Sequence, residues 1–130
     1  MILVTGGTGF IGSHLVERLA AKGRAVRCLV RRAGTNPPAA VELARGDLET
    51  GAGLAEALRG VDTVIHLAGV TKGRTVADYH RGNALGTATL LRAASRFDEV
   101  QRFVHVSSLA AAGATTRRRR CWWPSPTGTS

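Results

Sequence analysis

The sequence predicts an α/β protein built on a doubly wound parallel sheet with strand order 3-2-1-4-5. Short apolar runs alternate along the chain with segments of helical periodicity. Residues 2–4 and, apart from His66, residues 64–67 are apolar, as in strands that are covered on both faces. A glycine-rich turn follows the first run, where sheets of this class bind their ligands. Strands that alternate with helices require right-handed crossovers, and on this basis we expect the strand order 3-2-1-4-5.

Composition limits the function classes. The chain has 130 residues, enough for one domain, and a formal net charge of +9, of which four positive charges come from residues 117–120. The other cations are scattered without interleaved aromatic residues, which disfavours a nucleic-acid partner. The first strand begins at once, without a charged or long apolar leader, so we expect a cytoplasmic protein with no membrane contact. Cys28 and Cys121 are expected to be free thiols.

The first dozen residues carry most of the prediction. Residues 1–5 read as a strand, and the loop Gly6-Gly7-Thr8-Gly9-Phe10-Ile11-Gly12 leads into a helix that should end at Gly23. In a dinucleotide loop, glycines make the turn, let a pyrophosphate approach the main chain and let the helix pack on the strand. The alternative is a tight turn that uses glycine for conformation alone. We favour the phosphate loop because a strand precedes it and a helix N-terminus follows it.

The stretch VTGGTGFIGSHLVERL resembles the N-terminus of the extended short-chain dehydrogenase/reductase family of NAD(P)-dependent epimerases, dehydratases and reductases. The resemblance runs from Met1 to about Gly113, which implies an incomplete NAD(P)-binding Rossmann domain over residues 1–113. It implies that the loop binds the cofactor through Gly6, Gly9, Phe10, Ile11 and Gly12.

Two arginines follow the second predicted strand, residues 25–30. NAD sites place a carboxylate at this point to bind the ribose hydroxyls, whereas this chain has Arg31 and Arg32. Guanidinium groups bind phosphate bidentately, so the sequence favours NADP over NAD, with Arg31 as the main contact. The alternative is that both arginines are simply solvated.

A third strand is expected over residues 41–45, followed by Gly46, Asp47 and Leu48. The family resemblance implies that the Asp47 carboxylate accepts from the adenine amine and that Leu48 covers the ring. A turn or helix-cap role for Asp47 is the structural alternative.

The fourth strand is expected over residues 61–69 and ends in small residues. VIHLAG resembles the family strand that usually ends His-x-Ala-Ala, with Gly69 as a departure. The small side chains of Ala68 and Gly69 would let the cofactor lie close to the main chain, and Leu67 is assigned to the same cofactor site. His66 is expected to pack or to form hydrogen bonds rather than to catalyse.

Two helices and a last strand complete the pattern. They are a short helix that carries Leu54, Ala57 and Leu58 and ends at Gly60, a long helix from Asp78 to about Arg96, and a strand over 101–106. NALGTATLL resembles a family motif in which the asparagine, here Asn83, supports the active site. By the same resemblance, Ser108 is the catalytic residue that orients the substrate, and Ala112 replaces an aromatic residue. Their structural alternatives are an exposed helix residue and a plain turn.

Past Gly113 the resemblance ends. The family continues with Tyr-x-x-x-Lys, whose tyrosine transfers a proton, but the only tyrosine here is Tyr79, and Asn83 stands four residues after it. Residues 114–130 are expected to form an irregular, disordered basic tail. Two origins remain open: an out-of-frame reading of a GC-rich gene, or an arginine-rich tail that binds an acidic partner.

Two function classes therefore remain. The first is the cofactor-binding half of an oxidoreductase or epimerase, truncated and catalytically incomplete as written, which would act on a nucleotide sugar or small carbonyl compound only with its C-terminal part restored. The second is a non-catalytic NADP-binding module or a protein that interacts through its basic tail. No metal site is predicted. The fifth strand should be an open edge that favours self-association.

Overall fold

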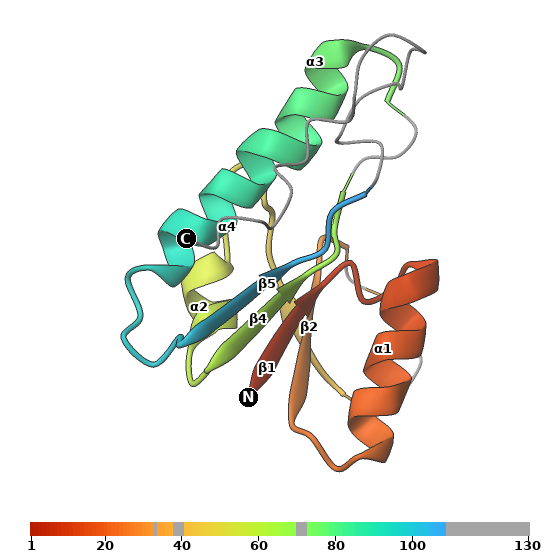
Figure 1. Ribbon diagram of the computed structural model, residues 1–130, viewed down its shortest axis with the longest axis vertical. Helices are drawn as coiled ribbons and strands as arrows, with labels where there is room; N and C mark the ends of the chain where they lie inside the picture. The colour runs from red at the N-terminus through yellow and green to blue at the C-terminus, as the bar shows by residue number, and fades with distance from the viewer. Residues whose placement is uncertain (33, 38–40, 70–72, 109–130) are drawn as a thin grey trace, which may run out of the picture.

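The computed structural model describes residues 1–32, 34–37, 41–69 and 73–108. One sheet of five parallel strands has the order β3-β2-β1-β4-β5 (Figure 1). Its strands are β1 (Ile2–Thr5), β2 (Val26–Val30), β3 (Glu42–Arg45), β4 (Thr63–His66) and β5 (Arg102–His105). The predicted order and the parallel pairing are confirmed, although every strand is shorter than predicted.

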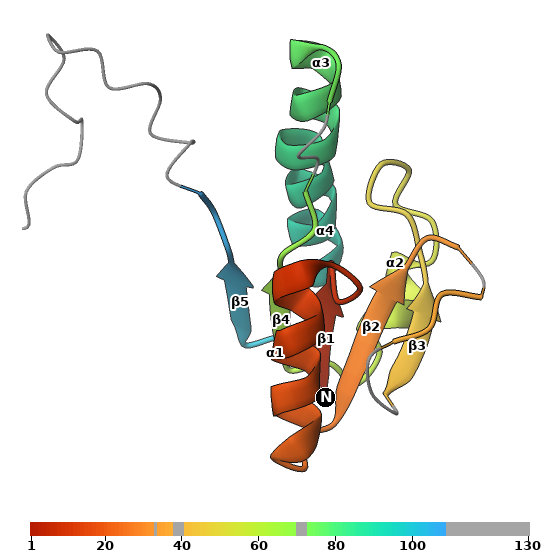
Figure 2. The same ribbon diagram turned by 90° about the vertical axis from the view of Figure 1, so that its right-hand side faces the viewer.

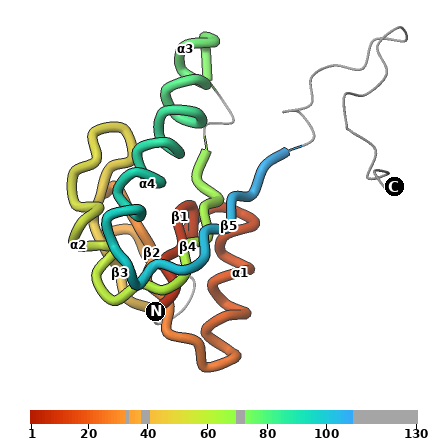
Figure 3. The backbone as a smooth tube through the Cα atoms, turned by 60° about the vertical axis from the view of Figure 1, so that its left-hand side comes forward, coloured from red at the N-terminus to blue at the C-terminus, as the bar shows by residue number. Residues whose placement is uncertain are grey.

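The chain changes direction across the sheet between β1 and β4. These strands pair in register, with Thr5 opposite His66. The connection after β1 leads to α1 (Phe10–Ala21) on one face, and the connection after β4 leads to the helices of the other face (Figure 3). Adjacent strands whose connections leave to opposite faces open a crevice at their carboxyl ends, which is where doubly wound sheets bind ligands.

Helix α1 covers the face formed by β1 and β2. Its Val16 is fully buried against Val4 and Cys28, and burial raises the pKa of the Cys28 thiol. The helix ends as predicted, because Gly23 adopts φ +70° and its N–H donates to the Ala20 carbonyl at 2.9 Å.

The opposite face carries the larger core. It is covered by α2 (Leu54–Leu58) and α4 (Gly86–Ala94), which lie across the sheet from α1 (Figures 1 and 3). Leu58 and Leu90 are fully buried there. These apolar contacts between a mostly parallel sheet and helices on both faces define a three-layer α/β fold.

The long helix predicted from Asp78 to Arg96 requires correction. It begins two residues earlier, as α3 (Val76–Tyr79), because Thr75 and Asp78 form a reciprocal capping box. A π-helical segment, η1 (His80–Leu85), then precedes α4. A π turn inserts an extra residue and rotates what precedes it, so Tyr79 does not continue the buried stripe of Leu90 and Ala94.

Strand β5 lies at the outer edge of the sheet (Figure 2). Val104 and Val106 are 39% and 42% exposed there, which agrees with the expected open edge. No helix in the described ranges is long and apolar enough to span a bilayer. The expectations for residues 109–130, including Ala112, Gly113, Cys121 and the basic tail, fall outside the described residues.

Candidate functional site

The glycine loop between β1 and α1 is shaped by close main-chain approaches. Gly6 has φ +75°, and its carbonyl accepts from the Gly9 N–H at 3.1 Å. A Cβ at Gly12 would overlap the Gly6 carbonyl oxygen, and one at Gly7 would lie 2.9 Å from the Cys28 sulfur. The fold therefore requires glycine at positions 6, 7 and 12.

Gly9 differs from its neighbours. Its φ of −77° and ψ of 178° are open to any residue, and a Cβ there would meet nothing closer than the Gly6 oxygen at 3.4 Å. The side chain would point away from the packed loop into open space. Neither backbone conformation nor packing therefore requires glycine at this position.

The N-terminus of α1 suits an anion. No side chain caps it, and its first turn holds no acidic residue. Phe10 and Ile11 are 83% and 63% exposed at this end. Unpaired N–H groups and the helix dipole both favour negative charge here, as in phosphate-binding loops.

The loop lies directly against the end of β4. A Cβ on Gly6 would come within 2.7 Å of the Ala68 nitrogen and 2.9 Å of the Leu67 carbonyl carbon. The Ala68 N–H donates to Thr5 Oγ1 at 3.3 Å. The structure thus brings together the predicted residues of the glycine loop and of the β4 end.

Below this edge, a buried hydrogen-bond chain joins β1, β4 and α4. His66 Nδ1 lies 2.6 Å from Thr5 Oγ1, and His66 Nε2 lies 2.8 Å from Thr87 Oγ1. Thr87 donates its own proton to the Asn83 carbonyl at 2.6 Å, so it accepts from Nε2–H. With Nε2 protonated, a neutral ring accepts the Thr5 proton at Nδ1.

The electrostatics agree with this tautomer. Burial, and secondarily the neighbouring His105, lower the pKa of His66 to about 4. The two rings stack with centroids 5.3 Å apart. The expectation that His66 forms hydrogen bonds rather than catalyses is supported by its full burial and its two hydroxyl partners.

Gly69 and Asn83 come together at the same edge. A Cβ on Gly69 would lie 3.0 Å from Asn83 Oδ1. Alanine, usual in the motif that this strand resembles, would press against the amide. Glycine therefore permits the close approach of η1 to the end of β4.

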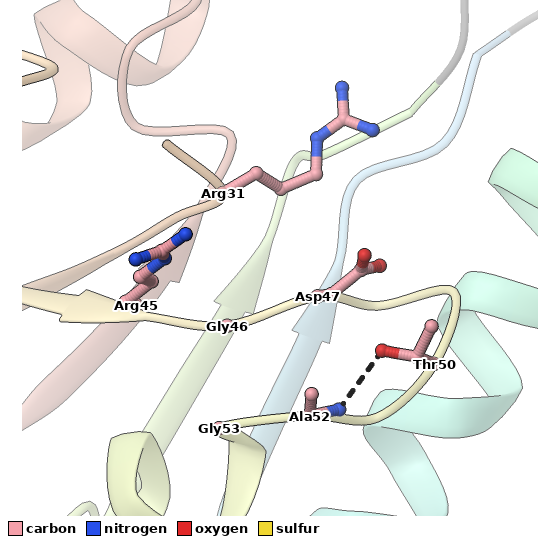
Figure 4. Close-up of a pocket in the computed structure, with 7 residues that line it drawn as sticks. All are labelled: Arg31, Arg45, Gly46, Asp47, Thr50, Ala52 and Gly53. Carbon is pink, nitrogen blue, oxygen red and sulfur yellow. Dashed lines mark hydrogen bonds between the residues drawn. The ribbon is translucent and has the colours of Figure 1, made fainter. Parts of the chain in front are cut away.

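On the other side of β1, an open cavity of about 380 Å³ lies at the ends of β2 and β3. Arg31, Arg45 and Asp47 line it, with Thr50, Ala52 and two glycines of the following loop (Figure 4). Arg32 is exposed and does not line it; its carbonyl accepts from Thr35 Oγ1 at 3.0 Å. Of the two predicted arginines, only Arg31 therefore faces the cavity.

Asp47 has the turn role that the sequence left open. Its Oδ1 accepts from the Glu49 N–H at 2.7 Å, and its own N–H donates to the Ala52 carbonyl at 2.9 Å. Leu48 is partly buried against the core under α2 and α4. Their contacts with an adenine ring stay a prediction.

Ser108 is exposed beyond the end of β5, at the carboxyl edge of the sheet. No cluster of potential metal ligands occurs among residues whose placement is described. Sequence reasoning missed Arg45 and the partners of His66. Only Arg45 had a usable signal, since it ends the strand next to the one that Arg31 follows.

Comparisons with known proteins agree with this geometry. The family model described as "NAD dependent epimerase/dehydratase family" matches residues 2–125. A 4-hydroxy-2-methyl-3-oxo-4-farnesyl-3,4-dihydroquinoline-1-oxide ketoreductase of Stigmatella aurantiaca is 42% identical over 111 residues, 82% of this chain and 33% of the relative. A ceramide reductase of Caulobacter vibrioides is 40% identical over 114 residues, 85% of this chain and 35% of the relative.

Among solved structures, MoeE5 in complex with UDP-glucose and NAD superposes with a TM-score of 0.75 at 37% identity. That match covers 88% of this chain and 38% of MoeE5. The chain spans about a third of the length of the curated relatives it matches.

Proposed function

We infer, because this chain belongs to the NAD-dependent epimerase/dehydratase family, that it binds a nicotinamide dinucleotide at the carboxyl edge of its sheet. The pyrophosphate would lie on the N-terminus of α1 and the adenosine between β2 and β3. The presence of NAD in the related MoeE5 structure supports a cofactor of this chemical class. When bound, the nicotinamide supplies hydride transfer.

We assign the cofactor contacts by element. The main chain of the glycine loop would hold the phosphates, the β2 and β3 ends the adenosine, and the β4 end the ribose and pyrophosphate. The assigned residues are Gly6, Gly9, Phe10, Ile11, Gly12, Arg31, Arg32, Asp47, Leu48, Leu67, Ala68 and Gly69.

The observation that carries this proposal is the glycine at position 9. Packing and backbone conformation account for Gly6, Gly7 and Gly12, but not for Gly9. Position 9 is exposed at the uncapped N-terminus of α1, where a pyrophosphate must approach the main chain. A bound ligand therefore accounts for the glycine at position 9.

Gly9→Ala tests the proposal directly. The variant should fold, since alanine adopts this backbone conformation and meets only an ordinary van der Waals contact, with a small loss of stability because alanine is a poorer N-cap than glycine. Its dinucleotide affinity should fall about tenfold or more, because one methyl group would displace the pyrophosphate. Calorimetric titration with NADP+ and NAD+ measures the affinity, and thermal unfolding checks the fold.

Ala21→Ser serves as the matched control, because it adds one atom at the opposite, exposed end of α1. The control should bind like the unmodified chain. If Gly9→Ala also binds normally, the loop is a tight turn and the proposed function is wrong.

We further propose that NADP is preferred over NAD. Arg31 lines the cavity beside the β2 end, and no carboxylate follows β2 to repel a ribose phosphate. Arg32, which is exposed and does not line the cavity, would add positive charge nearby.

For the activity of the whole protein, we propose reduction of a ketone or oxidation of the corresponding alcohol. The two relatives above, at 42% and 40% identity, are a ketoreductase and a ceramide reductase. A nucleotide-sugar substrate is the second candidate, supported by the UDP-glucose in MoeE5. Ser108 and Asn83 would contact or support the substrate at the β4 and β5 ends.

We propose that these 130 residues bind the cofactor without turning over a substrate on their own, because they contain no Tyr-x-x-x-Lys pair. General acid-base assistance is typically worth about a hundredfold to ten-thousandfold in rate. An assay of cofactor oxidation and reduction with ketones, aldehydes and sugar nucleotides tests this. Turnover that Ser108→Ala abolishes would contradict it.

A further inference from the structure

We propose that Arg45, the last residue of β3, is a second specificity-determining residue that binds the phosphate on the adenosine ribose together with Arg31. This inference rests on the proposed dinucleotide function and assigns one further residue to its adenosine end.

The two strand ends hold these arginines in a fixed relation. Val30 and Arg45 are register partners, and the Gly46 N–H donates to the Val30 carbonyl at 3.0 Å. Arg31 directly follows Val30, so both guanidinium groups start from adjacent points at the carboxyl edge. They line the same cavity (Figure 4).

The direction of the Arg45 side chain follows from the strand pattern. Ala44 packs against the core under α2 and α4. Because successive side chains of a strand point to opposite faces, Arg45 projects from the face on which α1 packs. The phosphate-binding N-terminus of α1 lies on that same face.

Arg31 and Arg45 differ from some other described arginines in having no ion-pair partner among the described residues. Arg27 pairs with Glu42 at 2.8 Å, and Arg59 pairs with Glu56 at 3.1 Å. Within the described part of the chain, neither Arg31 nor Arg45 forms an ion pair with a carboxylate. The cavity between them is therefore positively charged.

The chemistry of this cavity matches a phosphate monoester. Asp47 is the carboxylate that lines it, and one of its oxygens already accepts a turn hydrogen bond. Such a phosphate carries about −1.5 to −2 charge at neutral pH, and two guanidinium forks can each bind it bidentately. A ribose with free hydroxyls would leave both charges uncompensated. The alternative is that Arg45 is a solvated cation whose charge prevents the edge strand β3 from pairing with another chain.

The test titrates the whole 130-residue chain with NADP+, NAD+, 2′,5′-ADP and 5′-AMP. Arg45→Met keeps the length of the side chain and removes its charge. It should weaken NADP+ and 2′,5′-ADP about tenfold and leave NAD+ and AMP within about twofold, as expected for one charge-assisted contact at an exposed site. The NADP+ affinity of Arg45→Lys should lie between those of the unmodified chain and Arg45→Met, because lysine keeps the charge but cannot bind the phosphate bidentately.

Arg92→Met is the matched control, since Arg92 is exposed in the last turn of α4 and its loss should change no affinity. Arg31→Met should show the same selective loss as Arg45→Met. Thermal unfolding of every variant shows whether it is folded, and the lysine variant keeps the test decisive if the methionine variant unfolds.

Three results would overturn the inference. Unchanged NADP+ affinity in Arg45→Met would make Arg45 a solvated edge cation. Equal losses for all four ligands would place it against the adenine ring instead. If the unmodified chain binds none of the four, the proposed function itself fails and this inference fails with it.

Discussion

The two sides of the carboxyl edge of the sheet differ in the burial of their polar side chains. At the ends of β1 and β4, Thr5 and His66 are 1% and 0% exposed, and both are hydrogen-bonded within the chain. At the ends of β2 and β3, Arg31 and Arg45 are exposed, with no ion pair in the described ranges.

The difference separates what the fold needs from what a ligand needs. A buried polar group without a partner costs about 1–3 kcal/mol, so the fold must satisfy the β1 and β4 side by itself. Exposed guanidinium groups stay hydrated without such a cost and can exchange water for phosphate. We therefore expect changes on the first side to alter stability and changes on the second to alter cofactor choice.

The largest effect is expected from His66→Ala. The substitution opens a cavity in the core and leaves the Thr5 and Thr87 hydroxyls without their shared partner. It should lower the free energy of unfolding by about 3 kcal/mol, measured by urea denaturation. His105→Ala, at an exposed ring on the neighbouring strand, should cost less than about 1 kcal/mol. Equal losses in both variants would show that the hydrogen-bond chain contributes little.

Arg31→Asp should act on the other side of the edge. The carboxylate would repel a ribose phosphate and accept from ribose hydroxyls, so the ratio of NADP+ to NAD+ affinities should reverse by about 1.5–3 kcal/mol. Unfolding free energy should hardly change. Calorimetric titration with both cofactors provides the measurement, and equal affinity of the unmodified chain for the two would count against the NADP proposal.

The free energy of unfolding should fall at acid pH, because His66 is buried in its neutral form. The pKa of His66 is about 4 in the folded chain, below its ordinary value of 6.5, so the unfolded chain binds the proton more tightly. Stability is therefore complete above pH 6.5 and is lost as the pH falls towards 4. The loss should be about 2 kcal/mol between pH 7.5 and 5, above the range in which most carboxylates titrate.

The control for this pH dependence is His66→Gln, which cannot titrate. Urea denaturation at both pH values should show a much smaller difference for this variant. A slope that persists unchanged would assign the effect to other groups.

The smallest effect is expected at the open edge of β5. Val104 and Val106 are 39% and 42% exposed, and we propose that they promote self-association. Replacing both with threonine should shift sedimentation towards monomer while changing unfolding free energy by less than about 0.5 kcal/mol. Unchanged sedimentation would remove these valines from any contact between copies.

The sequence alone was sufficient for features that depend on local pattern. Apolar runs and helical spacing determine the strands and helices, and the handedness of crossovers then determines the strand order. The glycines around Gly9 and the arginine after β2 are likewise readable, because each acts where its own segment ends. The same local rules could not detect η1, whose extra residue shows no periodicity signal.

Tertiary structure decided everything that depends on two segments meeting. His66 acquires its tautomer and its lowered pKa only when β1 and α4 bring Thr5 and Thr87 to either side of the ring. Arg45 becomes a partner of Arg31 only through the register of β3 on β2. Gly69 matters because η1 brings Asn83 against it. Such contacts join positions far apart in the chain, so propensity and spacing within one segment contain no information about them.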